Sequence, residues 1–551
     1  METSHINRGG WITFPFIIAS TAALSLAAGG WMYNLMVYLI QEFHINSIDA
    51  ALIFNLVNGC TSLIPVIAAI VSDSFLGCYT VVWISSFVSF LGINLLFLIS
   101  SLRALRPEPC HELESLCKSP TNLQFTALYT GIILASIGTG GVRSTITTMG
   151  ADQFTKPKDQ QIYFDRYFVA TNLVSVIAST AMIYIEDNVS WAIGFGLSAF
   201  ANLLGSVIFL LGSRFYYRPN LDKSPYTDIA HVIVAATRKW NVPLSSKSED
   251  YNCCHDADTK KINIAPTKTL RFLNRAALIT NCDFNLEDSN ADPWKTCTVT
   301  QVEELKTVIK IFPIWFSNIF LGTAIGIQSS LVVLQSLTMD RGISHHFKIP
   351  AASILVFVLI FTAISLTVFD KFLMPACRKI FNLTPSPLQR IGIGHVLIIM
   401  TMAISAVVET KRLSLAKSDK LLEHSMVVPM SVFWLVPQLA ITGIGNAFQF
   451  PGQVTLYYQE FPTSLKSMST ALNHLVIAIS FFMSSALIDF VRKVTSWLPD
   501  NINKGKLHNV YWVLVLIGVI NFSYYLACAS LYKYQNVQKV EENLGSGSGH
   551  D

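Results

Sequence analysis

Twelve apolar stretches, each about as long as a lipid bilayer is thick, dominate this sequence of 551 residues. A helix that crosses the hydrocarbon core needs about 20 predominantly apolar residues. Six stretches precede a long polar segment at 214–302, and six follow it. They lie near residues 11–40, 50–71, 80–101, 124–147, 162–185, 190–212, 308–335, 350–373, 390–408, 427–452, 467–490 and 509–532. We therefore predict an all-α membrane protein with twelve transmembrane helices.

The composition excludes several other classes of protein. Apolar residues make up 52% of the chain and charged residues only 13%, about half the charge of an average soluble protein. A disordered chain and an ordinary cytosolic enzyme are therefore excluded. The net charge of +4 is too small to imply a nucleic-acid partner. The expected partners are the lipid bilayer and a small-molecule or anion substrate, and a single sequence leaves the oligomeric state open.

Basic residues predict how the chain crosses the membrane. Of the loops after the second, fourth, sixth, eighth and tenth stretches, all but the first carry Lys or Arg or have one at their edge, for example Lys156, Lys371 and Arg390. The loops after the first and fifth stretches carry none, although those after the ninth and eleventh carry some. Because Lys and Arg favour the cytosolic side, we predict that both termini are cytosolic. We expect the plasma membrane as the location and the vacuolar membrane as the alternative.

The polar segment divides the sequence into two similar halves. We predict an N-terminal six-helix bundle over 1–212, a cytosolic linker over 213–302, a C-terminal six-helix bundle over 303–533 and a flexible cytosolic tail over 534–551. Two such bundles around a central pathway form the major-facilitator fold, which works by rocking the bundles about a midplane binding site.

A short motif recurs at the same place in both halves. The letters D-S-F-L-G begin at Asp73 after the second stretch, and D-K-F-L begin at Asp370 after the eighth. A carboxylate in such a loop can pair with a basic residue of a neighbouring helix and hold one conformation. We predict that Asp73 and Asp370 belong to a gate. The alternative is that Asp73 only ends a helix.

The cysteines and histidines do not predict a metal site. Cys110 and Cys117 follow the third stretch, on the predicted oxidising side, where a disulfide between them is expected; two free thiols are the alternative. Cys253 and Cys254 have neither a C-x-x-C partner nor suitably spaced His residues. We expect no metal, no cofactor and no enzymatic activity, because no nucleophile–base pair or phosphate-binding loop is visible.

Several motifs resemble signatures of the plant nitrate and peptide transporter family, part of the proton-dependent oligopeptide transporters of the major facilitator superfamily. They are G-T-G-G-V-R at 138–143 followed by G-A-D-Q-F at 150–154, I-E-D-N-V-S-W at 185–191, F-K-I-P at 347–350 and Y-Q-E-F-P at 458–462. G-G-W-I-T-F-P-F at 9–16 and W-L-P-D at 497–500 resemble the nitrate-excretion branch of that family. The resemblance implies alternating access and a small-molecule substrate.

The sequence departs from this family at the positions that most members use for proton coupling. Most members carry E-x-x-E-[RK] in the first helix, and the matching positions here are Thr21 to Ser25, without a carboxylate. A glutamate within G-E-A-F is common in the tenth helix, and this sequence has Asn446 instead. The seventh helix has no histidine over 322–328, where the well-known nitrate importer of the family has one. Because proton coupling needs a group that changes protonation, we predict transport without proton coupling.

One cation stands out after these losses. Arg143 lies inside an apolar stretch, where an arginine costs at least about 2.5–3.5 kcal/mol, so it should face the pathway or a partner. Its planar guanidinium can bind a flat oxyanion such as nitrate with two hydrogen bonds. The alternative is that Arg143 pairs with Asp165 or Glu460 and only fixes helix packing.

Amides and aromatic residues at helical spacing predict the remaining cavity lining. A single buried amide is more often a helix–helix contact than a ligand contact, but three amides in line in the tenth helix suit a hydrated surface. His474 is the remaining residue able to titrate near pH 6.5. The predicted substrate-binding residues besides Arg143 are Trp31, Asn34, Tyr38, Asn55, Gln328, Asn446, Gln449, Gln453 and His474.

These observations leave three functions open. The first is a passive carrier or exporter of nitrate or a similar anion. The second is a carrier of a plant metabolite such as a glycoside, uncoupled or weakly coupled to protons. The third is a receptor or scaffold that signals through the 214–302 loop. The missing carboxylates and Arg143 favour the first.

Overall fold

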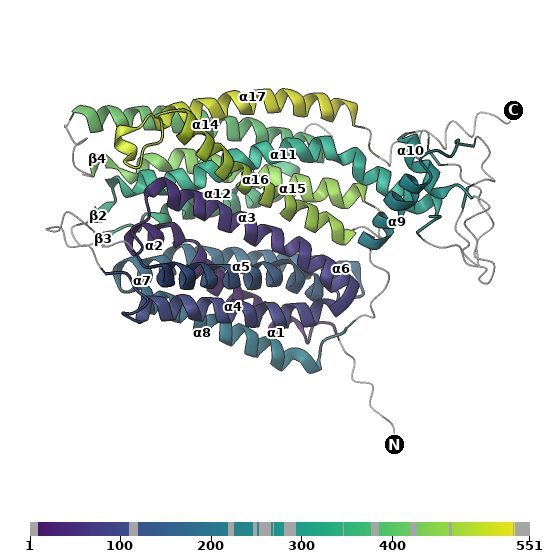
Figure 1. The fold of residues 1–551 in the computed structure, drawn as a ribbon, viewed down its shortest axis with the longest axis horizontal. Coiled ribbons are helices and arrows are strands. Elements are labelled where there is room, and N and C mark those ends of the chain that lie inside the picture. Colours follow the sequence, from purple (N-terminus) through teal and green to yellow (C-terminus); the bar gives the residue numbers. More distant parts are fainter. Residues whose placement is uncertain are drawn as a thin grey trace, which may run out of the picture.

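The computed structural model describes residues 9–108, 120–218, 225–245, 251–252, 266–267, 269–279, 294–344, 347–375, 379, 385–418, 427–461, 466–532 and 534. Cys110 and Cys117 lie outside these residues, so their disulfide stays a prediction. The described part is almost entirely helical (Figure 1).

Six helical crossings form the N-terminal bundle. The first consists of α1 and α2, and the fifth consists of α6 and α7, which a short π-helix at Ala178–Met182 joins. The helices are α1 (Phe14–Met32), α2 (Leu35–Gln41), α3 (Ser47–Val71), α4 (Gly77–Ser101), α5 (Asn122–Ala151), α6 (Pro157–Ile177), α7 (Ile183–Asn188) and α8 (Trp191–Leu211).

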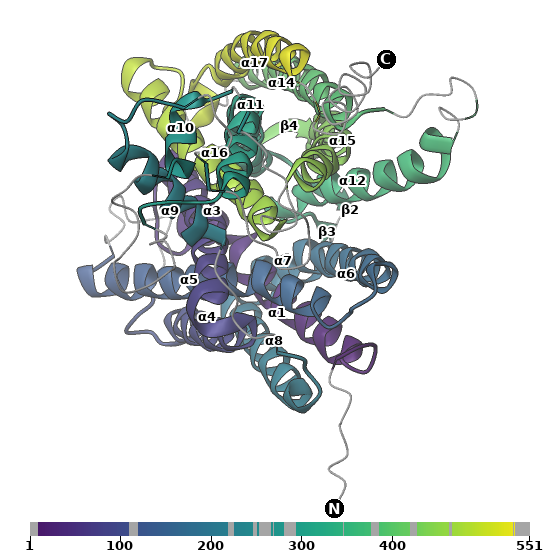
Figure 2. The same ribbon diagram turned by 90° about the vertical axis from the view of Figure 1, so that its right-hand side faces the viewer.

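Six more crossings form the C-terminal bundle. Its helices are α11 (Val299–Leu337), α12 (Val356–Val368), α14 (Pro387–Ser418), α15 (Val436–Glu460), α16 (Lys466–Val494) and α17 (Leu507–Leu531). Figure 2 looks along the helices and shows the two bundles next to each other, with α3 and α16 packed together at their junction.

The number of crossings agrees with the prediction. Among the described residues, ten stretches are long and apolar enough to span a membrane. One of them, Ser47–Ser101, holds two helices, α3 and α4. The amides of α15 lower its hydropathy, so it is not among the ten although it has 25 residues. The twelve helices of a major-facilitator fold are therefore confirmed.

The recurring D-x-F-L motif has the same backbone in both halves. Asp73 lies in a π-helix, Ser72–Leu76, which ends at Gly77 with a φ of 74°. A residue with a Cβ is strained at such a φ, whereas glycine is not. Asp370 lies in the π-helix Phe369–Leu373 after α12. The side chain of Asp370 lies outside the described part, so its contacts stay a prediction.

The opposite ends of the bundles carry different additions (Figure 1). At the linker end, α9 (Pro225–Arg238) and α10 (Arg271–Asn274) pack on the start of α11 around an apolar cluster that includes Val232, Ala276 and Val302. The other end, which we call the hairpin end, carries four short strands. They are β1 (Met339–Asp340), parallel to β4 (Val428–Ser431), and β2 (Gly342–Ser344), antiparallel to β3 (Phe347–Lys348).

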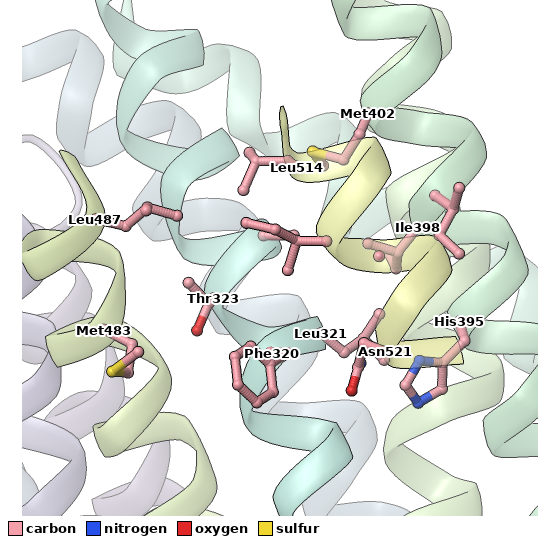
Figure 3. A pocket seen from close by; sticks show the side chains of 14 residues that line it. Phe320, Leu321, Thr323, His395, Ile398, Met402, Met483, Leu487, Leu514 and Asn521 are labelled. Carbon is pink, nitrogen blue, oxygen red and sulfur yellow. The ribbon is translucent and has the colours of Figure 1, made fainter. Parts of the chain in front are cut away.

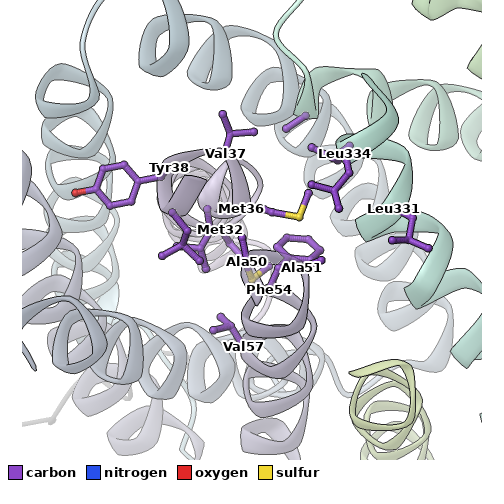
Figure 4. Close-up of a cluster of buried hydrophobic side chains, with 14 of the residues drawn as sticks. Met32, Met36, Val37, Tyr38, Ala50, Ala51, Phe54, Val57, Leu331 and Leu334 are labelled. Atoms are coloured by element: carbon purple, nitrogen blue, oxygen red, sulfur yellow. The ribbon is translucent and has the colours of Figure 1, made fainter. Parts of the chain in front are cut away.

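The largest apolar cluster joins both bundles. Phe54 and Ala51 of α3 and Met36 of α2 belong to the same buried cluster as Leu331 and Leu334 of α11 (Figure 4). Burial of apolar side chains contributes roughly 25 cal/mol per Å² where it removes them from water. Within a membrane, however, packing and hydrogen bonds carry most of the helix association. The close packing of this cluster therefore keeps the bundles together on its side of the molecule.

Candidate functional site

The predicted central cation is accessible and forms no ion pair with the described residues. Arg143 lies on α5 and is exposed, although its neighbours Val142 and Thr145 are buried. No described residue forms a salt bridge with its guanidinium, Glu460 included. The side chain of Asp165, the other predicted partner, lies outside the described part. With respect to the described residues, Arg143 is therefore a free positive charge within a membrane-spanning helix.

The charge of Arg143 reaches residues of both bundles. Its charge acts electrostatically on His474 of α16 and on Tyr167 of α6. His474 is half-buried, and its Nδ1 atom has no hydrogen-bond partner in the described part. The cation and the predicted titratable residue, which lie in different bundles, are therefore close enough to interact electrostatically.

The amides of α15 are buried, and several of their atoms lack partners. Asn446, Gln449 and Gln453 are 9%, 2% and 1% exposed. The side-chain oxygens of all three, and the amide nitrogen of Gln453, have no hydrogen-bond partner among the described residues. An unpaired buried polar atom costs about 1–3 kcal/mol. These atoms are enclosed in this conformation, and they would gain partners where water or a hydrogen-bonding substrate reaches them.

Other predicted lining residues are occupied by the protein itself. The amide nitrogen of Gln328 donates to Ser405 Oγ at 3.5 Å, and its oxygen accepts from Thr442 Oγ1 at 2.8 Å. Asn55 of α3 donates to Ser330 Oγ of α11 at 3.2 Å and so links the two bundles. Both amides serve helix packing in this conformation.

The predicted face of the first helix lies inside the N-terminal bundle. Trp31 is fully buried and donates from Nε1 to Thr139 Oγ1 at 3.3 Å. Tyr38 packs against Trp191 and Phe195, with ring centroids 4.9 and 5.0 Å apart. Asn34 is 1% exposed. We leave these three residues out of the anion site proposed below.

Two carboxylates that the sequence analysis did not single out are fully buried in the hairpin half of the helices. Glu409 forms a salt bridge with Arg412 at 2.7 Å and accepts from Gln335 Nε2 at 2.6 Å. Glu186 of α7 is 1% exposed, and its carboxyl has no geometric hydrogen bond in the described part, although Asn34 lies next to it. Neither forms an ion pair with Arg143.

Ion pairs link the bundles at the hairpin end. Arg492 at the end of α16 contacts Asp49 at the start of α3 and donates to Asp500 at 3.1 Å. Arg341 lies between β1 and β2, and its Nη1 atom is 3.8 Å from Oδ2 of Asp187 in α7. Asp49 lies in the first turn of its helix and Arg492 in the last turn of its own, where each charge interacts favourably with the helix dipole. Asp49 and Arg492 are 443 residues apart in the chain, and no sequence pattern indicates that they pair.

Carboxylates also meet at the linker end. Asp73 lines a small cavity together with Ser144 and Thr148 of α5 and Thr470 of α16. Asp152 directly follows α5. Desolvation by the surrounding protein raises the pKa of its carboxyl to about 6, and the negative charge of Asp73 adds to this shift. Asp73 therefore lies at the junction of the bundles, as a gate residue would. Among the described residues, no group of three His, Cys, Asp or Glu side chains could hold a metal ion.

Comparison with known proteins decides the family. The model of the POT family matches residues 79–507. Protein NRT1/PTR FAMILY 2.7 of Arabidopsis thaliana is 46% identical over 542 residues, which cover 98% of this chain and 96% of the relative. Protein NRT1/PTR FAMILY 2.6 of the same plant is 44% identical and covers 100% and 97%. The chain belongs to the POT family. It is a membrane transporter and not an enzyme.

The fold of this POT transporter agrees with that of solved members. The crystal structure of an auto-inhibited POT family peptide transporter superposes with a TM-score of 0.70 at 16% sequence identity, covering 95% of this chain and 97% of that one. The likeness supports the fold alone. The predicted nitrate-excretion branch is not decided by these comparisons and stays a prediction.

This POT transporter lacks carboxylates at the places where the family resemblance implies them. Thr21 is buried in α1, Ser25 is half-buried, and Asn446 stands in the tenth membrane helix. Arg143, by contrast, is present and accessible. The arrangement keeps the positive charge and replaces acidic side chains by neutral ones. Such a site can attract an anion, and it offers few groups that could accept a proton.

Proposed function

We propose that this POT transporter is a proton-uncoupled carrier or exporter of nitrate or a similar small anion, working by alternating access. The single observation that carries the proposal is Arg143, an exposed guanidinium without an ion pair to any described residue. A positive charge within a membrane-spanning helix is costly unless it faces water or a partner. An anion bound to Arg143 supplies the missing charge, and it leaves when the site opens to the other side.

The shape of the cation supports a planar oxyanion as substrate. The guanidinium presents parallel N–H groups that match two oxygens of nitrate. His474 is within electrostatic reach of Arg143, and the side-chain oxygens of the α15 amides and the nitrogen of Gln453 have no hydrogen-bond partner in the described part. We include Arg143, His474, Asn446, Gln449 and Gln453 in the proposed site.

The membrane potential is the energy source in this proposal. It is worth about 2.3 kcal/mol per elementary charge at 100 mV. An anion inside a negative cell therefore leaves without a coupled proton. We place the transporter in the plasma membrane with both termini in the cytosol, and the vacuolar membrane is the alternative location. The N-terminal bundle over 1–212 and the C-terminal bundle over 303–533 are the two moving parts.

Voltage clamp of oocytes that express the protein tests this proposal. We expect a nitrate-dependent current whose size changes little between external pH 5.5 and 7.5. Arg143→Ala should remove the current, and Arg143→Lys should restore only part of it, because an ammonium group cannot form the paired hydrogen bonds. Arg166→Ala is the matched control, since the Arg166 guanidinium packs over the Trp11 ring of the same bundle. A current that rises steeply with the proton gradient would contradict the proposal.

A second candidate substrate is a neutral plant metabolite such as a glycoside. The unpaired amide atoms of Asn446, Gln449 and Gln453 favour it, because amides bind sugar hydroxyl groups well. In that case transport of the glycoside is electrically silent, and Arg143→Ala leaves much of it intact. Uptake of a labelled glucoside into the same oocytes, measured next to nitrate current, separates the two candidates.

A further inference from the structure

An apolar cavity lies among helices of the C-terminal bundle, apart from the proposed anion site. It has a volume of about 110 Å³. Side chains of α11, α14, α16 and α17 line it, and Figure 3 shows Leu514 and Met402 at one end and His395 and Asn521 side by side at the other. None of Arg143, His474 or the α15 amides lines this cavity.

One buried polar atom in the cavity lining has no partner. His395 is 1% exposed, and its Nε2 atom has no hydrogen bond in the described part. The imidazole ring stacks on Tyr525 at a centroid distance of 4.6 Å, which fixes its orientation. Asn521 next to it already donates its amide N–H to the backbone oxygen of Ser317 at 2.9 Å. The imidazole lines the cavity and makes no hydrogen bond to a described residue, so His395 has hydrogen-bonding capacity left for an occupant of the cavity.

The remaining lining favours a ring. Ile398, Met402, Leu487 and Leu514 provide an apolar surface, and an apolar cavity of about 150 Å³ in an engineered protein stays dry and takes up benzene. Methionine sulfur makes favourable contacts with aromatic rings, and Met402 and Met483 both line the cavity. A single aromatic ring suits both the size and the chemistry of this space.

The cavity has an access route from the bilayer. Met483 lines it and is also 40% exposed on α16. Both α16 and α17 pack on α11, and the cavity lies over α11 where the two helices flank it. Because methionine is unbranched and has three rotatable bonds, Met483 can move aside for a compound dissolved in the lipid.

We propose that this cavity binds a phenol, a compound with one aromatic ring and one hydroxyl group, taken up from the lipid phase. The ring lies among the apolar side chains, and the hydroxyl pairs with the imidazole of His395. A hydroxyl both donates and accepts, so it satisfies either neutral tautomer of the histidine. The proposal does not rest on the proposed anion transport, because the two sites share no residue.

Ligand-observed ¹⁹F NMR on the purified full-length protein tests the phenol site. The probes are 4-fluorophenol and 4-fluorotoluene, which have nearly the same shape and differ in the hydroxyl group. We expect saturable binding of 4-fluorophenol, about tenfold tighter than binding of 4-fluorotoluene, the difference that one hydrogen bond provides. His395→Phe keeps the stacking on Tyr525 and should remove this preference. Equal affinities of the two probes for the wild type would overturn the proposal.

A variant that fills the cavity provides the second test. Ala324→Leu places extra carbon atoms into the cavity lining and should abolish binding of both probes, whereas Ala363→Leu, an exposed position on α12, should change nothing. Retained binding in Ala324→Leu would overturn the site. If that variant fails to fold, photolabelling of the wild type with an azidophenol decides: labelled peptides must contain residues of α14 or α16 that line the cavity. Displacement of the phenol by nitrate would also overturn the proposal, since it would place both ligands in one site.

Discussion

Two arginines in membrane-spanning helices differ in how their charges are balanced by the described residues. Arg412 is fully buried and is matched by Glu409, with Asn503 and Thr338 accepting its other N–H groups. Arg143 is exposed and has no ion pair in the described part. A fully satisfied pair serves the fold, and a cation that lacks its partner can serve a substrate. The surroundings, and not the residue type, separate the two roles.

Loss of Glu409 should destabilise the protein strongly. Glu409→Ala leaves Arg412 buried without its counter-charge, which costs about 3–5 kcal/mol in comparable pairs. Thermal unfolding in detergent, followed by intrinsic fluorescence, measures the effect as a lower Tm. Asp489→Ala is the control, because Asp489 and Lys493 form an exposed pair worth about 0–1 kcal/mol. Equal Tm values for the two variants would contradict this role of Glu409.

Asp152 should make stability depend on pH at the linker end. Its pKa of about 6 in the folded protein lies above its ordinary value of 3.8. Folding therefore favours the protonated carboxyl, and the protein loses stability as the pH rises from about 4 to 6. We expect Asp152→Asn to raise Tm at pH 7 and to change it little at pH 4. A Tm difference that is the same at both pH values would contradict the shifted pKa, and Asp489→Asn is the control.

The site residues show what a sequence can and cannot predict at this scale. Arg143 and the α15 amides are recognisable because polar residues inside apolar stretches need a reason. The contacts of Trp31 with Thr139 and of Asn55 with Ser330 depend on which helices become neighbours. Helical spacing places residues on one face, but it does not say whether that face meets another helix or the pathway.

At the scale of helices and turns, ionic contacts across the junction gather at the hairpin end. Arg492 joins Asp49, and Arg341 approaches Asp187. Ser485 of α16 also donates to the backbone oxygen of Leu52 at 3.2 Å. These contacts hold the hairpin end together in a conformation in which Arg143 is accessible. A carrier that alternates between two states must break them in the other state.

Removal of Arg492 should loosen the hairpin end. Arg492→Ala deletes the contacts with both Asp49 and Asp500, so we expect faster amide hydrogen exchange over 47–55 and 485–494. Lys493→Ala is the control, because among the described residues Lys493 pairs only with Asp489 of the same helix. Unchanged exchange in Arg492→Ala, measured by mass spectrometry, would show that these pairs do not hold the bundles.

The whole molecule was largely predictable as an architecture. Twelve apolar stretches and a central polar segment were sufficient for the two six-helix bundles, because the bilayer thickness sets the helix length. The details within single crossings were not predictable. The first stretch is divided into α1 and α2 near Asn34, and π-helices interrupt the turns after α3 and α12. Such breaks depend on packing between helices, which apolar length does not encode.

Anion binding should stabilise the molecule as a whole. A ligand that binds only the folded state at 100 times its Kd adds about 2.7 kcal/mol to stability. We expect nitrate to raise the Tm of the wild type, and to have no effect on Arg143→Ala. Gluconate at the same ionic strength is the control for general salt effects. An equal rise with both salts, or in the variant, would contradict a nitrate site at Arg143.

Helix α11 is long enough to extend well beyond the hydrocarbon core of the membrane. The helix has 39 residues and is therefore about 58 Å long, almost twice the roughly 30 Å of hydrocarbon that it crosses. Its outer turns are fixed in the apolar cluster of α9 and α10, and Lys306 adds hydrogen bonds to Thr267 there. A nanobody attached to that cluster would therefore tilt together with the C-terminal half. The angle between such a marker and one on the other half would report each turnover without touching the pathway.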